Sequence, residues 1–336
     1  NDLSSRTLTL DEAREILAHF FIKGCEWIDG QQVTSGDAQH YQNIVLSGID
    51  ENGNEVTNEV TYLVLDIVEE TGIGDFPITV RINKHTDEKF ICRVAEVIRY
   101  GGGIVAVYNE DLILESLEEM GYPREEARRF ANDGCWEIQI PGKTKFVYVP
   151  FDALKLLQKT TLSDYDGTAS FENFDELLKK YIADIKNQVE AIFETSVLSI
   201  FKDDKFNFKP DNPCSVISLF EQSCIEKGLS YKEGGTVYTV VSPHIGGLPD
   251  AVNSLYAIKK AVFDDKIISF GEFMKTLENN WDGSEDLRKY ILNDYTYFGN
   301  DNDEVDEIAA KILNDFSDAC MEYDSKTPVR FVSGVS

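Results

Sequence analysis

The sequence has 336 residues, of which 42% are hydrophobic and 11% aromatic, so it can bury the core of one or two globular domains. Sixty acidic residues against 32 basic ones give a formal net charge of −28, which repels nucleic-acid phosphates and anionic membrane surfaces. We therefore expect neither nucleic acid nor membrane as a partner. No apolar run approaches the roughly 18 residues of a membrane helix, and no signal peptide is recognised, so a cytoplasmic protein is expected.

The first 130 residues alternate between helical and strand patterns. Apolar side chains recur at helical spacing, and the short apolar runs between these stretches have the length of strands. Strand-then-helix units of this length predict parallel pairing in an α/β architecture, with the chemistry at the carboxyl ends of the strands. We expect helices over 9–24, 56–68, 86–99 and 111–120, and strands over 41–49, 77–82 and 104–108.

The rest of the sequence is mostly helical in pattern, with one strand expected near 236–241. The polar stretches 159–172 and 202–213 are interpreted as loops, and neither has the composition of an interdomain linker. We therefore interpret residues 1–336 as a single domain. The expected helices cover 151–158, 174–201, 215–227, 252–262, 269–279, 284–292 and 303–322.

Several patterns that resemble metal sites have simpler interpretations. The turn at Asp50 lacks the final carboxylate of a calcium loop and reads as an Asn-Gly turn. The acidic residues of 301–306 are interpreted as the first turn of a helix.

Six cysteines without a C-x-x-C pair indicate neither a disulfide framework nor a zinc site, so most should be reduced and buried. We expect no metal and no bound cofactor; among the histidines, only His244, near a Gly-Gly turn, is a candidate to follow.

The most informative segment is 130–137, in which Cys135 and Glu137 stand two positions apart after Gly134. We expect it to follow a helix that ends near Phe130, and to be extended so that thiol and carboxylate share one side. A thiol beside a carboxylate suits nucleophilic catalysis. That chemistry usually also needs a histidine base and an oxyanion hole, and this neighbourhood supplies neither.

The run Phe-Ala-Asn-Asp-Gly-Cys-Trp-Glu at 130–137 resembles the thiyl-radical loop of glycyl radical enzymes. This superfamily includes pyruvate formate-lyase and the diol, choline and hydroxyproline lyases, in which Gly-Cys-Val-Glu is usual. Other segments match in the same order and extend the resemblance from about residue 8 to 325: 42–65, 77–111, 250–262 and 297–301. The resemblance implies an α/β fold that forms part of the family's ten-stranded α/β barrel, with a helix-rich periphery.

The resemblance also implies a mechanism. Cys135 would carry a transient thiyl radical that abstracts hydrogen from a carbon of a small-molecule substrate. Glu137 would act as base toward the neighbouring hydroxyl, so that a ketyl-like radical anion expels the leaving group; such base catalysis contributes about 10²–10⁴-fold. The family implies an oxygen-sensitive homodimer of the anaerobic lyase or dehydratase type. A radical S-adenosylmethionine activating enzyme would install the glycyl radical on a separate C-terminal loop.

Departures from the family pattern leave alternatives open. Gly134 stands where pyruvate formate-lyase has a second cysteine, which disfavours acyl transfer to coenzyme A, and Trp136 leaves the substrate undefined. Neither the family's N-terminal third nor its glycyl loop is recognised, so we expect the central portion of such a domain, inactive by itself. One alternative is a formate C-acetyltransferase-like or decarboxylating carbon–carbon lyase of the same superfamily. Another is a non-catalytic split or truncated subunit with a binding or assembly role.

Overall fold

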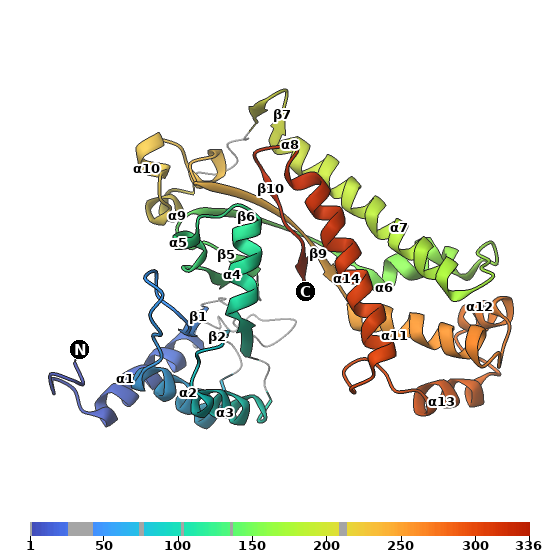
Figure 1. Cartoon of the computed structure of the whole chain (residues 1–336), viewed down its shortest axis with the longest axis horizontal. Coiled ribbons are helices and arrows are strands. Elements are labelled where there is room, and N and C mark those ends of the chain that lie inside the picture. Colours follow the sequence, from blue (N-terminus) through green and yellow to red (C-terminus); the bar gives the residue numbers. More distant parts are fainter. Residues whose placement is uncertain (1, 26–42, 74–76, 102–103, 135–136, 208–213) are drawn as a thin grey trace. The chain divides into compact units, whose positions relative to one another are not determined.

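The computed structural model describes residues 2–25, 43–73, 77–101, 104–134, 137–207 and 214–336 (Figure 1). The chain divides into two compact units, residues 1–141 (unit 1) and 142–336 (unit 2). Each unit is described by itself, and the interpretation of the chain as a single domain stays a prediction. Within the described ranges, no helix is both long enough and apolar enough to cross a membrane.

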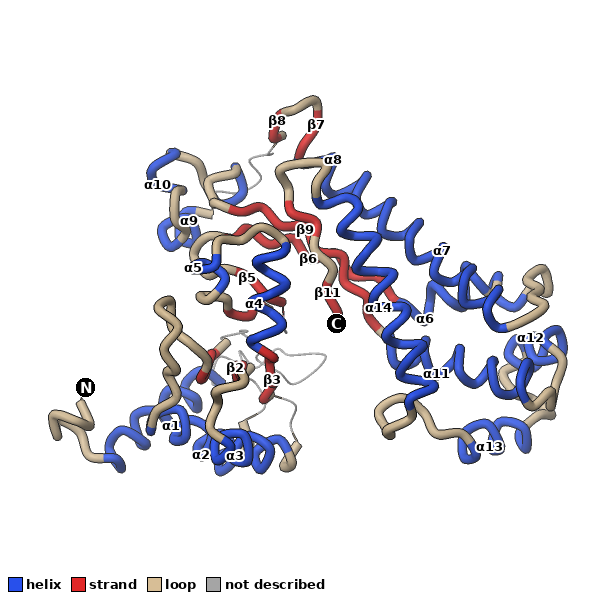
Figure 2. The backbone as a smooth tube through the Cα atoms, in the orientation of Figure 1, coloured by secondary structure: helices blue, strands red, loops and turns tan. Residues whose placement is uncertain are grey.

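Unit 1 is built on a three-stranded parallel sheet with the order β1-β2-β3, and helices alternate with these strands along the chain (Figure 2). The register places Ile78 opposite both Ile44 and Val105. The predicted parallel strand-and-helix pattern is confirmed. The strands are β1 (Ile44–Ser47), β2 (Ile78–Ile82) and β3 (Val105–Asn109), and the helices are α1 (Leu10–Cys25), α2 (Glu59–Thr71), α3 (Glu88–Ile98), α4 (Glu110–Glu119) and α5 (Arg124–Ala127).

The two faces of this sheet differ in chemistry because side chains alternate along a strand. On one face, Leu46, Ile78 and Val80 belong to an apolar core that also includes side chains of α1, α2 and α3. The opposite face carries Thr79 and Arg81, and these side chains are buried as well. Buried polar groups need hydrogen-bond partners, because their removal from water is otherwise unfavourable.

Unit 2 is centred on β9 (Tyr238–Gly246), which pairs in parallel with β6 (Thr144–Asp152) and with two short strands, β10 (Arg330–Phe331) and β11 (Gly334–Val335). Its core joins this sheet to several helices. Figure 1 shows two of them, α7 (Phe174–Ile192) and α14 (Asp303–Asp324), side by side. The other elements are α6 (Ala153–Leu156), α8 (Leu198–Ile200), β7 (Phe201–Lys202), β8 (Lys205–Phe206), α9 (Ser215–Phe220), α10 (Cys224–Lys227), α11 (Leu248–Ile258), α12 (Phe270–Glu278) and α13 (Glu285–Asp294), and the short turns η2 (Ser163–Tyr165) and η4 (Tyr231–Glu233).

Unit 2 differs from the sequence expectation in several ways. The helix expected over 215–227 is divided into α9 and α10, and β9 extends to Gly246, beyond the strand expected near 236–241. Strand β6 is nine residues long and was not predicted; the helix expected from residue 151 begins only at Ala153. In addition, three α-helices continue directly into π-helical turns, which add residues without ending the helical apolar pattern. These turns are η1 (Leu157–Thr161), η3 (Phe193–Val197) and η5 (Lys259–Asp264).

Two of the turn interpretations are confirmed. The Asp50 carboxylate accepts hydrogen bonds from the backbone N–H groups of Asn52 (2.9 Å) and Asn54 (2.8 Å), which makes this segment an Asx turn. Asn302 caps the amino end of α14, and the acidic residues after it lie in the first helical turn. Among the side chains that the structure describes, no group of three or more could hold a metal ion.

The cysteines are less uniform than expected. Cys224 and Cys320 are buried, but Cys92 is exposed on α3 and Cys214 is half-buried, so the expectation of burial is wrong for these two. Burial raises the pKa of the Cys320 thiol to about 12. Because the thiolate is the reactive form, the environment of Cys320 makes it unreactive near neutral pH.

This difference predicts selective alkylation. At pH 8 a thiol of this pKa is ionised in about one molecule in 10⁴, so Cys320 should react with iodoacetamide far more slowly than Cys92. Peptide-resolved mass spectrometry on the folded protein measures both rates, and labelling in urea provides the control in which both thiols react. Equal rates for the two thiols in the folded protein would contradict the burial of Cys320.

Candidate functional site

The segment singled out in the sequence is an antiparallel hairpin. Strands β4 (Ala131–Asp133) and β5 (Glu137–Gln139) pair with Asp133 opposite Glu137. The preceding helix α5 ends at Ala127, earlier than expected, and the residues on either side of the turn are extended as two paired strands. The expectation that the thiol and the carboxylate share one side stays a prediction. Cys135 and Trp136 lie outside the described residues. Glu137, the first residue of β5, is half-buried.

Gly134 explains how the hairpin accommodates the Glu137 carboxylate. Its φ of +52° lies in the left-handed region that favours glycine. A Cβ atom at this position would lie 2.7 Å from Oε2 of Glu137, closer than a Cβ atom can approach. The carboxylate therefore lies directly over Gly134, the residue that precedes Cys135 in the chain.

A buried ion pair supports the hairpin from the sheet. The guanidinium of Arg81 donates to Oε1 of Glu110, and their side chains are only 7% and 0% exposed. Glu110 also accepts from the backbone N–H of Ile49 (3.1 Å) and from Nδ2 of Asn83 (2.6 Å). Desolvation lowers the pKa of Arg81, and the nearby Glu110 charge opposes that shift. The pair is therefore held by several charge-assisted hydrogen bonds rather than by a single contact.

The same arginine reaches the segment that leads into the hairpin. Arg81 donates to the carbonyl oxygens of Arg128 (2.8 Å) and Phe130 (3.3 Å), and its guanidinium lies 4.2 Å from the centre of the Phe130 ring. Next along the sheet, the Thr79 hydroxyl donates to the side-chain oxygen of Asn132. These contacts give buried polar atoms partners, although Nε of Arg81 and Nδ2 of Asn132 are buried without a hydrogen-bond partner among the described residues.

The hairpin consequently runs along the polar face of the sheet. Arg81, near the carboxyl end of β2, contacts Phe130, just before the hairpin. Thr79, earlier in β2, contacts Asn132. The turn is reached at Gly134, whose carbonyl accepts a hydrogen bond from Asn43, the residue before β1. Gly134 therefore lies toward the amino end of β1. Because Cys135 lies outside the described residues, the expectation that the chemistry lies at the carboxyl ends of the strands stays a prediction.

A glycine makes room for the ion pair. Gly48 follows β1 with a φ of +85°, and a Cβ atom there would lie 2.8 Å from side-chain atoms of both Arg81 and Glu110. Sequence reasoning did not select any of these three residues as part of the site. The available signal was Arg81, a charged residue inside an otherwise apolar strand, which predicts a buried partner.

Unit 2 contains the one histidine that the sequence singled out. His244 is in the middle strand β9 and is 2% exposed. Its ring centre lies 4.6 Å from that of Tyr148, and Gly334 on the neighbouring strand leaves space for it. This is the environment of a histidine packed among aromatic side chains of its own sheet.

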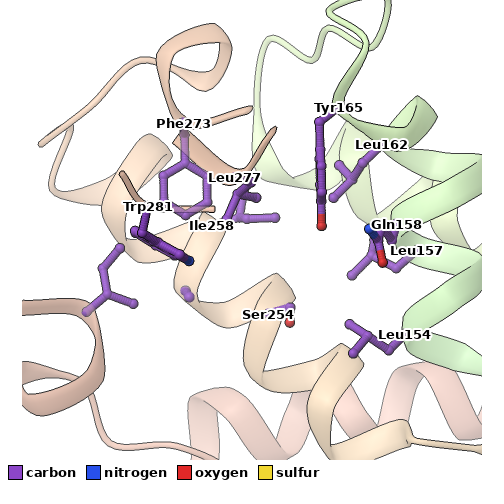
Figure 3. A pocket seen from close by; sticks show the side chains of 12 residues that line it. Leu154, Leu157, Gln158, Leu162, Tyr165, Ser254, Ile258, Phe273, Leu277 and Trp281 are labelled. Atoms are coloured by element: carbon purple, nitrogen blue, oxygen red, sulfur yellow. The ribbon is translucent and has the colours of Figure 1, made fainter. Parts of the chain in front are cut away.

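A cavity of about 120 Å³ also lies in unit 2, between the α6–η1 segment and α11 with the helices that follow it (Figure 3). Figure 3 shows Tyr165 and Gln158 on the same side of this space. Its lining is mostly aliphatic and aromatic and contains no acid–base pair, so it does not suit the elimination chemistry expected of the hairpin. The lining residues are Leu154, Leu157, Gln158, Leu162, Tyr165, Ser254, Ala257, Ile258, Phe273, Leu277, Trp281 and Ile291.

Comparison with known proteins agrees with the sequence motifs. The family described as pyruvate formate lyase-like matches residues 1–334. Trans-4-hydroxy-L-proline dehydratase from Clostridioides difficile is 29% identical over 337 residues, which cover 93% of this chain and 41% of the relative. (2S)-3-sulfopropanediol dehydratase from Klebsiella oxytoca is 26% identical over 333 residues, covering 91% of this chain and 39% of the relative.

Solved structures show the same relationship. The substrate-bound hydroxyproline dehydratase of Clostridioides difficile matches with a TM-score of 0.79 at 26% identity, covering 99% of this chain and 44% of that one. The B12-independent glycerol dehydratase of Clostridium butyricum gives a TM-score of 0.74 at 27% identity, with coverages of 98% and 43%. The chain thus spans about two fifths of the relatives' length. The predicted α/β fold, part of the ten-stranded barrel, and the relationship to the dehydratase and lyase branch of glycyl radical enzymes are confirmed.

The buried ion pair predicts a large effect on stability. Glu110→Ala leaves the Arg81 charge buried without its partner, which should lower the free energy of unfolding by about 3–5 kcal/mol. The control is Glu96→Ala, which removes a carboxylate that is 59% exposed beside Arg93 and should cost about 0.5 kcal/mol or less. Urea unfolding measures both values, and equal losses would refute the role given to Glu110.

Gly134 predicts a local effect that can be separated from backbone strain. Gly134→Ala and Gly72→Ala both place a Cβ atom on a left-handed residue, which should cost about 1 kcal/mol. Only Gly134→Ala also displaces a side chain, because nothing lies within 4 Å of a Cβ atom at Gly72. Urea unfolding should therefore show the larger loss for Gly134→Ala. A loss no greater than that of Gly72→Ala would mean that the Glu137 carboxylate does not lie over Gly134.

Proposed function

This chain belongs to the pyruvate formate lyase-like family, and we propose that it forms part of a glycyl radical lyase or dehydratase. In this proposal a thiyl radical on Cys135 abstracts a hydrogen atom from the substrate, and Glu137 is the base. The observation that carries the proposal is the hairpin, in which the Glu137 carboxylate lies over the residue immediately before Cys135. A half-buried carboxylate two residues after the cysteine in the chain suits a base for a bound substrate.

The proposed reaction balances without an added oxidant or reductant. The glycyl radical takes the hydrogen atom of the Cys135 S–H bond, which forms a glycine C–H bond and leaves a thiyl radical on Cys135. The thiyl radical takes a hydrogen atom from the hydroxyl-bearing carbon, which leaves a carbon radical and an S–H bond. Glu137 removes the hydroxyl proton, the adjacent carbon–leaving-group bond breaks with its electron pair, and an α-carbonyl radical remains. Return of a hydrogen atom from Cys135 forms the product and regenerates the thiyl radical.

The substrate we propose is a small molecule with a hydroxyl group next to a leaving group. Two relatives described above are named as dehydratases of (2S)-3-sulfopropanediol and of glycerol, which carry neighbouring hydroxyl groups and fit this description. A third is named for trans-4-hydroxy-L-proline, whose single hydroxyl would itself be the leaving group, so hydrogen would be taken from a neighbouring carbon without a hydroxyl. We further propose a cytoplasmic, oxygen-sensitive homodimer whose glycyl radical lies on a polypeptide segment outside this chain. A radical S-adenosylmethionine activating enzyme would be its partner in activation, and the chain itself would hold neither metal nor organic cofactor.

The other members of the superfamily remain the second choice. Acyl transfer of the formate C-acetyltransferase kind uses consecutive cysteines, and the preceding position here is Gly134, where a Cβ atom would displace the Glu137 carboxylate. A carbon–carbon lyase would not need a base in the position of Glu137. A non-catalytic split or truncated subunit would not need the carboxylate beside Cys135 either.

Substitution of the two residues tests the proposal. In the full-length gene product, activated anaerobically, Cys135→Ser should abolish turnover and leave the glycyl radical signal in electron paramagnetic resonance intact. Glu137→Gln should also keep the signal but lower turnover by about 10²–10⁴-fold, the contribution of a general base. The matched control is Cys92→Ser, which removes an exposed thiol and should turn over like the wild type.

Product formation is measured with trans-4-hydroxy-L-proline, (2S)-3-sulfopropanediol and glycerol, each with the radical content determined in the same sample. Continued turnover by Cys135→Ser would overturn the assigned radical role. Full turnover of these substrates by Glu137→Gln would overturn the base role given to Glu137, and a wild-type protein that never acquires the radical would favour the non-catalytic alternative.

A further inference from the structure

Asn43 makes two hydrogen bonds to the hairpin from one side chain. Its Nδ2 donates to the carbonyl oxygen of Asn132 at 3.2 Å and to that of Gly134 at 3.3 Å. An amide nitrogen carries two hydrogens, so both are used on this segment. The Gly134 carbonyl belongs to the peptide bond that links Gly134 to Cys135.

The contact occupies the open edge of the hairpin. Within the described part of the chain, β4 pairs only with β5. The carbonyl groups of residues 132 and 134 point toward Asn43, where a neighbouring strand would otherwise donate. A two-stranded hairpin is marginally stable by itself, so an added donor on its free edge restricts how the turn can move.

The side chain of Asn43 is not the one that would give the folded protein the greatest stability at this position. The Oδ1 atom of Asn43 is buried and has no hydrogen-bond partner among the described residues. A buried acceptor without a partner is unfavourable, which offsets much of the gain from the two donated bonds. An apolar side chain of the same size would avoid that cost. The benefit of the asparagine therefore lies in fixing the two carbonyl groups.

We propose that Asn43 is a positioning residue for the hydrogen-transfer reaction, and that it acts by holding the backbone of the β4–β5 hairpin. The inference rests on the proposed function of Cys135 and Glu137. Both residues follow closely in the chain after the carbonyls of residues 132 and 134 that Asn43 binds. Hydrogen transfer requires reacting atoms within about 3–3.5 Å, and a misplacement of about 1 Å can cost 10²-fold in rate. A donor that fixes the turn from residue 132 to residue 134 provides that precision.

The first test needs no catalytic activity. In the full-length protein before activation, Asn43→Leu keeps the side-chain volume and removes both donated hydrogen bonds. Hydrogen–deuterium exchange of the backbone amides in residues 131–139 should become about 10-fold faster. The reason is that each of the two lost hydrogen bonds contributes modestly to the stability of the hairpin against local opening. The control is Asn58→Ala, which removes the amino-terminal cap of α2 and should speed exchange there but not in the hairpin. Unchanged hairpin exchange in Asn43→Leu would overturn the inference.

The second test separates positioning from a structural role. In activated enzyme, Asn43→Leu should lower kcat about 10–100-fold, leave KM within about twofold, and keep the glycyl radical content of the wild type. Asn43→Gln, which keeps the amide, should recover part of that loss, and Asn58→Ala should match the wild type. A radical content that falls in proportion to kcat, or an equal loss in Asn58→Ala, would overturn the inference.

The two proposals can fail separately. If Cys135→Ser still turns over, the proposed radical function is wrong, whatever Asn43→Leu does. If Cys135→Ser is inactive and Asn43→Leu turns over at the wild-type rate, only the positioning role of Asn43 is wrong.

Discussion

A buried pair of opposite charges, Arg81 and Glu110, connects four separate parts of unit 1. Arg81 is on the middle strand, Glu110 begins α4, Ile49 follows β1, and Phe130 leads into the hairpin. Burying two charges costs several kcal/mol for each, and only close pairing with additional hydrogen bonds offsets that cost. Each connected segment therefore has one position in which the charges are satisfied, which makes the pair a device for fixing register rather than a source of net stability.

This constraint gives the sheet its unusual second face. A central parallel strand is normally apolar on both faces, yet here alternate residues of β2 are polar and bind the segment that crosses them. Thr79 and Arg81 hold the approach to the hairpin, and Asn43 holds its turn. The result is a segment in which the backbone carbonyls of Phe130, Asn132 and Gly134 accept hydrogen bonds from Arg81 and Asn43. The proposed thiyl radical would benefit from such support, because an unguided thiyl radical would react with whatever it touches.

Local patterns in the sequence were sufficient for the parallel sheet but not for the hairpin. Helical spacing and short apolar runs predicted α2, β2 and α3 close to their observed bounds. The contacts that shape the site join residues far apart in the chain: Asn43 and Gly134 are separated by 91 positions. No local pattern reports such a contact. Strand β6 was missed for a related reason, since its pairing with β9 lies about 90 residues away and its half-buried side chains blur the strand pattern.

The candidate residues themselves came from the motif rather than from periodicity. Cys135 and Glu137 were selected by their resemblance to a radical loop, and the structure adds the hairpin that sets Glu137 over Gly134. Arg81 and Glu110 carried a weaker signal, a charge within an apolar strand and an acid at a helix start. Only the fold reveals that they are partners.

The central claim is that this hairpin begins catalysis by removing a hydrogen atom from carbon. The most direct measurement is a competition in which activated full-length enzyme receives equal amounts of a hydroxylated substrate and the same compound with deuterium on the hydroxyl-bearing carbon. Mass spectrometry of the remaining mixture reports which form is consumed faster. Faster consumption of the unlabelled form, which enriches deuterium in the remainder, is the result that hydrogen abstraction predicts. Equal consumption of both forms would contradict it.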